Sequence, residues 1–191
     1  MKKIAGRIIS YMCNQNVINR NDYEIYRYGL QSALEVFGAT VINMIISQII
    51  GCLKELICFL LIFIPVRAYA GGFHMKKYGY CFLCSTIVVN SFLFVSKQIR
   101  FSKFADLLLI LIFAIVIVVI GPVENKNRKL DDNEKIVFNQ RLNYIMCVCA
   151  FLSMLFYYAN FVFFLSMMQI TFLFVVISMI LGKVINYWNT Q

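Results

Sequence analysis

The chain has 191 residues, of which 61% are hydrophobic and only 14% are charged. Soluble domains average about 45–50% apolar and about 25% charged residues, so the composition excludes an ordinary soluble domain. The apolar runs are continuous rather than alternating, which favours membrane-spanning helices over an outer-membrane barrel. We therefore expect an all-α, polytopic integral membrane bundle that forms a single domain over residues 1–191.

The net charge of +9 is a second constraint on function. In a membrane protein, such an excess usually belongs to cytoplasmic loops that face anionic lipid headgroups. It also suits recognition of an acidic substrate. No basic region stands apart from the apolar segments, so nucleic-acid binding is not expected.

Residues 1–20 are predicted to form an amphipathic helix on the membrane surface. Ile4, Ile8, Tyr11 and Met12 fall on one helical face, as expected for a helix that lies in the interface. A capping box of Asn21 and Glu24 is then expected to open a second helix.

Six apolar segments follow, some of them short for a membrane span. The predicted segments are 22–50, 56–66 (ending at Pro65), 81–95, 104–122 (closed by Gly121 and Pro122), 144–160 and 161–181. Residues 123–141 are expected to form the main polar loop, and a tail is expected from Gly182. Both polar loops around the 104–122 helix are basic, so the positive-inside rule does not fix the orientation.

The single histidine, His74, lies seven residues before Cys81 in a Gly-rich polar segment, residues 67–80, that we expect to be partly re-entrant. A histidine within hydrogen-bond reach activates a cysteine by accepting its proton. Seven residues of straight helix separate two side chains by about 10 Å, which is too far for that transfer. A catalytic His74–Cys81 pair therefore requires the chain between them to fold back, and the glycines of this segment permit it.

The residues around the pair suit acyl transfer. Cys81 opens an apolar helix, where free backbone N–H groups and the helix dipole favour a thiolate and an oxyanion. Arg67, Lys76 and Lys77 add positive potential, and the Arg67 guanidinium suits a substrate carboxylate or carbonyl oxygen.

Other interpretations of these residues stay open at this point. His74, Cys81 and Cys84 could bind a metal ion, although they supply only three ligands; we expect no metal and no cofactor. His74 could be a packed structural side chain, and Cys84 is a rival nucleophile. A third group that orients His74 would have to come from elsewhere, and the sequence does not rank the candidates Glu35, Asn43 and Glu55.

The motif Arg67-x3-Gly71-Gly72-x-His74-x6-Cys81 resembles the signature of the AgrB family, the membrane-embedded cysteine endopeptidases of bacterial quorum sensing. The later run from Gly121 to Asn127 resembles the family's segment after its central hydrophobic helix. Length, charge and hydropathy agree along the whole chain.

The resemblance implies that the protein cleaves a short precursor peptide, AgrD, at the start of its acidic C-terminal tail. Cys81 would attack the scissile carbonyl with His74 as base, and a cysteine of the precursor would then close a thiolactone from the acyl-enzyme thioester. Arg67 and Gly72 match positions of the family motif, and we expect them to support the substrate or the oxyanion. The family also implies a homodimer.

We accordingly expect a multi-pass protein of the bacterial plasma membrane with its active site at the cytoplasmic side. The alternative is a membrane peptide exporter or scaffold without enzymatic activity.

Overall fold

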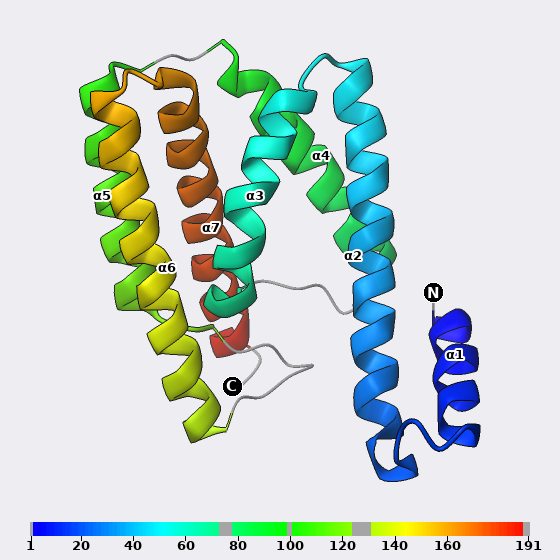
Figure 1. Ribbon diagram of the computed structural model, residues 1–191. Helices are drawn as coiled ribbons and strands as arrows, with labels where there is room; N and C mark the ends of the chain where they lie inside the picture. Colours follow the sequence, from blue (N-terminus) through cyan, green and yellow to red (C-terminus); the bar gives the residue numbers. More distant parts are fainter. Residues whose placement is uncertain (1, 73–77, 99–100, 124–130, 189–191) are drawn as a thin grey trace.

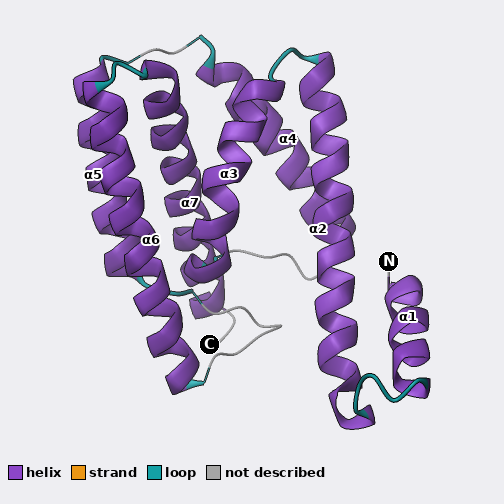
Figure 2. Ribbon diagram, viewed as in Figure 1, coloured by secondary structure: helices purple, strands orange, loops and turns teal. Residues whose placement is uncertain are grey.

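The computed structural model describes residues 2–72, 78–98, 101–123 and 131–188 of the chain. All the regular secondary structure in those residues is helical (Figure 2), which confirms the all-α prediction. The elements in chain order are α1 (Lys2–Asn14), the short 3₁₀ helix η1 (Arg20–Asp22), α2 (Tyr23–Ile49), α3 (Leu53–Ala70), α4 (Tyr78–Ser96), α5 (Lys103–Ile120), α6 (Asp132–Tyr158) and α7 (Val162–Trp188).

Helices α3, α5, α6 and α7 lie side by side and enclose the larger apolar core (Figure 1). The most buried of them is α7: half of its apolar stretch is buried, compared with 22% in α5 and in α6. Between apolar helices in lipid, this close packing is the main attraction. The buried side chains of this core include Val66, Ile110, Ile117, Leu142, Leu165, Phe172 and Val175.

Helices α2 and α4 form a second half of the molecule that is held by polar side chains. The apolar stretch of α2 is only 6% buried. Asn90 of α4 donates a hydrogen bond to Asn43 of α2 at 2.7 Å and accepts one from Ser47 at 2.8 Å. All three side chains are buried, and amides and hydroxyls of this kind join helices inside a membrane.

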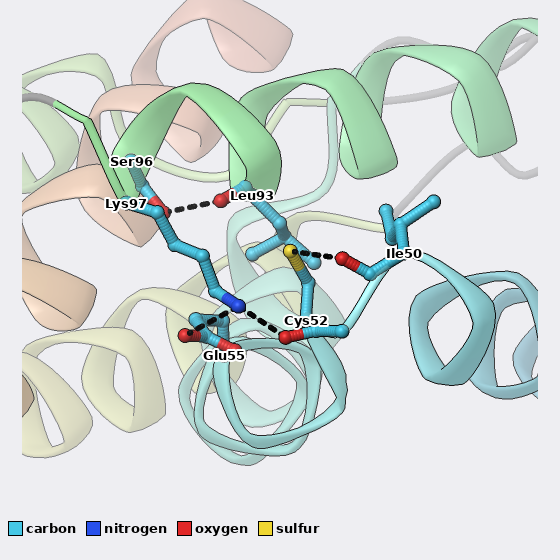
Figure 3. A network of polar contacts seen from close by, with 7 residues as sticks. Ile50, Cys52, Glu55, Leu93, Ser96 and Lys97 are labelled. Atoms are coloured by element: carbon cyan, nitrogen blue, oxygen red, sulfur yellow. Dashed lines mark hydrogen bonds and ion pairs between the residues drawn. The ribbon is translucent and has the colours of Figure 1, made fainter.

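The two halves meet near the end of the bundle that is uppermost in Figure 1. Leu56 and Phe59 of α3 pack there with Val89 and Leu93 of α4, and Phe174 of α7 makes edge contact with Phe59. Figure 3 shows polar contacts at this end of the bundle, some of them made by Cys52 and Leu93 of the cluster.

The opposite end, called the lower end below, is where α3, α5 and α7 finish and where α2 and α6 begin (Figure 1). Helix α4 starts nearer the middle of the bundle and crosses α2 obliquely. The lower end therefore gathers the last turn of α3 with the chain on either side of the α5–α6 connection.

The amphipathic N-terminal helix exists, but it ends at Asn14 rather than near residue 20. Only part of its apolar surface is exposed, because the rest packs against α2. Ala5, Ile9 and Cys13 of α1 are buried, and Ile9 and Cys13 pack in a small cluster with the start of α2, whereas Ile4 and Ile8 are exposed. The predicted capping box of α2 is wrong, because η1 runs through that position and α2 begins at Tyr23.

The predicted end of the third helix at Pro65 is also wrong. Pro65 lies inside α3, which continues to Ala70. A proline removes one helical hydrogen bond, and its ring crowds the carbonyl four residues earlier. Membrane helices tolerate this where neighbouring groups compensate. Residues 67–70, expected in the polar segment, are therefore helical.

Two polar stretches expected outside helices belong to helices. The polar loop predicted over residues 123–141 stops at Asp131, because Glu134 accepts a hydrogen bond from the backbone N–H of Asp131 at 3.3 Å and caps α6. The tail predicted from Gly182 is helical to Trp188. Gly182 is buried in α7, so it serves close packing rather than helix termination.

Four helices in the described part of the chain are long and apolar enough to cross a membrane: α2, α5, α6 and α7. The apolar part of α4, Phe82–Ser96, is shorter, and α3 carries Lys54, Glu55 and Arg67 within its 18 residues. Of the six predicted segments, these two are thus the least like complete spans. The molecule is a helical membrane bundle.

Candidate active site

The candidate active site starts at the lower end of α3, where the helix stops at a pair of glycines. Gly71 has φ 64° and is the residue after the last turn, with its N–H donating to the Arg67 carbonyl at 3.1 Å. A side chain is strained in this left-handed conformation, so glycine is favoured here.

Gly72 is buried, and the Arg67 side chain occupies the space where a Cβ would lie. A Cβ on Gly72 would clash with the Arg67 guanidinium and would lie 3.1 Å from the Ser178 carbonyl oxygen of α7. The guanidinium also donates a hydrogen bond to the Gly71 carbonyl. Arg67 and Gly72 are thus complementary in shape, which explains a motif that contains both.

A segment far away in the sequence pairs with this turn. The N–H of Val123 donates to the Ala70 carbonyl at 2.9 Å, and Gly71 and Val123 form a parallel bridge. Gly121 ends α5 with φ 66°, as its predicted role at the helix end requires. Sequence reasoning missed the contact of Val123 with the motif, and the Gly121-Pro122 pair just before Val123 was the one signal that could have found it.

Cys81 lies in the first turn of α4, so its backbone position agrees with the expectation of a helix start. Its side chain is outside the described part of the structure, as are His74, Lys76 and Lys77. The fold-back between His74 and Cys81 therefore stays a prediction. Cys84 is exposed and lies one turn further along α4.

The described residues offer no alternative metal centre. Among them, no three acidic, cysteine or histidine side chains come together. The ligand set considered from the sequence contains His74 and Cys81, which that finding does not cover.

The three candidates for a group that orients His74 have different positions and different hydrogen-bond partners in the structure. Glu55 lies at the upper end, where Lys97 Nζ is 3.6 Å from its carboxylate and also donates to the Gly51 carbonyl (Figure 3). This is the end remote from the Gly71–Gly72 turn. Asn43 is engaged with Asn90 and with the Ala39 carbonyl at 2.8 Å.

Glu35 lies on α2 eight residues before Asn43, which is about 12 Å nearer to the lower end of the bundle. Unlike Glu55, it is therefore not at the end remote from the Gly71–Gly72 turn. The half-buried Glu35 carboxylate accepts a hydrogen bond from Gln31 at 2.9 Å.

The fold and this turn define a class of protein: a helical membrane protein with a glycine turn, held by an arginine, that leads to a cysteine at a helix start. A family model described as accessory gene regulator B, AgrB, matches residues 2–185, nearly the whole chain. The chain belongs to the AgrB family. Neither a curated relative nor a solved structure matches it. Membership is consistent with a role in quorum-sensing peptide processing.

Proposed function

We propose that the protein is a membrane cysteine endopeptidase that removes the C-terminal tail of a small AgrD-like precursor peptide and supports its cyclisation to a thiolactone. The observation that carries the proposal is the turn at the end of α3. Arg67 fills the space left by Gly72, and nine residues after Gly72 the chain supplies Cys81 in the first turn of α4. Family membership along nearly the whole chain supports the same activity.

In this mechanism, His74 accepts the proton of the Cys81 thiol, and the thiolate attacks the carbonyl carbon at the tail junction. Backbone N–H groups in the first turn of α4 are suited to the resulting oxyanion. The C–N bond then breaks, the imidazolium protonates the leaving amine, and a thioester to Cys81 remains.

The second step transfers the acyl group to a thiol of the precursor itself. That thiol attacks the Cys81 thioester, the thiolactone forms, and the Cys81 thiol is regained with its proton. No water is consumed, so a site that excludes water favours the ring over the hydrolysed peptide. Lys76 and Lys77, like the Arg67 side chain, supply positive potential for the substrate.

The charge distribution supports a cytoplasmic site. The upper end carries only Lys54, Lys97 and Lys103 among its described basic residues. Cytoplasmic ends of membrane helices carry the excess of lysine and arginine, so the lower end is proposed to face the cytoplasm. The described basic residues in the lower part of the bundle are Lys3, Arg7, Arg20, Arg27, Arg67, Lys135, Arg141 and Lys183.

The test is incubation of the purified protein with a candidate precursor, followed by mass spectrometry. We expect release of the tail and a product without added water. Cys81→Ala and His74→Ala should each abolish release, while the matched control Cys84→Ala should retain it. Full cleavage by Cys81→Ala refutes the mechanism, and transport of an intact precursor without a thioester on Cys81 supports an exporter or scaffold instead.

A further inference from the structure

Arg141 of α6 is held against the last turn of α3. Its guanidinium donates to the Tyr69 hydroxyl at 3.2 Å and lies over the Tyr69 ring, 5.6 Å from the centroid. The Tyr69 ring also makes edge contact with Phe138 of α6, with the ring centroids 5.5 Å apart. A guanidinium stacked in this way keeps a defined orientation, and Tyr69 accepts a hydrogen bond from one of its nitrogens.

A hollow of about 290 Å³ lies beside this pair. Its walls are the side chains of Tyr69, Gln140, Arg141, Tyr144 and Ile145, and they are formed mainly by rings and aliphatic carbon. The hollow is large enough for one apolar side chain of a peptide, and Arg141 and Gln140, both exposed, supply donors at its edge.

The charge of Arg141 is not balanced within the described residues. Neither of the ion pairs described there, Arg27 with Glu24 and Lys97 with Glu55, involves Arg141. The hollow is also close to the candidate site, because Tyr69 precedes Gly71 by two residues in the last turn of α3. A cationic, partly apolar hollow next to the site matches a peptide that combines carboxylates with an apolar side chain.

Resting on the proposed function, we propose that this hollow, the Arg141 hollow, binds the acidic tail of the precursor peptide. Arg141 contacts a tail carboxylate, an apolar tail residue enters between Tyr144 and Ile145, and Tyr69 is a positioning residue that holds the guanidinium. The hollow thereby selects peptides with an acidic segment after the scissile bond.

Direct binding tests the proposal without cleavage. The Cys81→Ala protein, in nanodiscs of phosphatidylcholine, is titrated with a fluorescent peptide in which one leucine is flanked by glutamates, and with its glutamine counterpart. Adding Arg141→Gln should weaken binding of the glutamate peptide about three- to fivefold, as expected for an exposed charge pair, and leave the glutamine peptide unchanged. Tyr69→Phe should give a smaller loss, again for the glutamate peptide alone.

The matched control is Lys183→Gln, which removes an exposed basic residue at the same end of the bundle; it should leave the affinity unaltered. An equal loss for both peptides, or an equal loss in Lys183→Gln, overturns the proposal. So does an Arg141 effect that appears only when phosphatidylglycerol is added, because the hollow then binds lipid headgroups.

The two proposals fail in different ways. If the wild-type protein forms no thioester with any precursor while Arg141-dependent binding of the glutamate peptide persists, the proposed function fails and the Arg141 hollow stands. If Cys81 is acylated and Arg141→Gln leaves binding unchanged, the hollow is wrong and the proposed function stands.

Discussion

In the half built from α3, α5, α6 and α7, the helices meet through a continuous apolar core, whereas α2 meets α4 through two amides and a hydroxyl. The family motif is divided between these halves. Arg67 and Gly72 lie on the apolar half, where the turn is closed by Val123 and by α7. Cys81 opens α4, which belongs to the polar half.

This difference indicates that the two parts of the motif tolerate amino-acid substitutions to different degrees. Close packing against backbone resists any added atom, so the Arg67–Gly72 turn should be rigid. Hydrogen bonds between membrane helices contribute only about 0.6 kcal/mol on average, so the position of α4 is held less strongly. Substitutions in the two halves should therefore differ in the size of their effects.

The largest effect is expected for Gly72→Ala. The added Cβ would displace the Arg67 guanidinium and press on the Ser178 carbonyl, at a residue with φ 123°. We expect tail release to fall at least about 100-fold, because small misplacements of catalytic groups cost this much. Mass spectrometry of the released tail measures it.

Gly29→Ala is the matched control for this substitution. Nothing lies within 4 Å of a Cβ at Gly29, which is inside α2. Alanine is favoured over glycine in a helix by about 1 kcal/mol, so Gly29→Ala should retain activity and unfold at the same or a higher temperature in a thermal melt. Equal activities of Gly72→Ala and wild type would contradict a rigid turn.

The apolar half also shows which features the sequence could predict. The end of α5 at Gly121 followed from a glycine-proline pair after a long apolar run. The pairing of Val123 with Gly71 could not be predicted, because it depends on two helices finishing at the same level of the bundle. The start of α6 was missed because its charged first turns look like a loop until the Asp131–Glu134 cap is recognised.

In the polar half, the sequence predicted that Cys81 lies near a helix start, but it could not rank Glu35, Asn43 and Glu55. Separating them needs the contact of Asn43 with Asn90 and the position of Glu55 at the upper end, which no local pattern encodes. Short-range periodicity gives the face of a helix, whereas the partner of that face is set by packing over the whole chain.

An intermediate effect is expected for Glu35→Gln. If the carboxylate orients His74, its replacement by an amide should reduce the rate of thioester formation about tenfold, less than the roughly 100-fold or greater contribution of a general base. This rate is measured by rapid quenching and quantification of the acyl-enzyme formed on Cys81.

The control for Glu35 is Glu55→Gln, at the upper end beside Lys97. It should leave the rate unchanged, since Glu55 pairs with Lys97 at the end of the bundle remote from the turn. Equal losses in the two variants would assign Glu35 a general electrostatic role, and a pH profile identical to that of the wild type would argue against its action through His74.

The smallest effect is expected for Asn90→Leu, which removes the side chain that joins Asn43 to Ser47. The loss should be about 0.6–1.7 kcal/mol of helix association, enough to let α4 move relative to α2 and to lower tail release by several-fold.

The apolar half should be unaffected, so the buried thiol of Cys149 should stay as slow to alkylate as in the wild type. Ser96→Ala is the control, because the Ser96 hydroxyl donates to the Leu93 carbonyl of its own helix, at 2.7 Å, and not to another described helix (Figure 3). If Asn90→Leu exposes Cys149 while tail release stays normal, then the packing of the apolar half depends on the α2–α4 contact, which contradicts the comparison of the two halves.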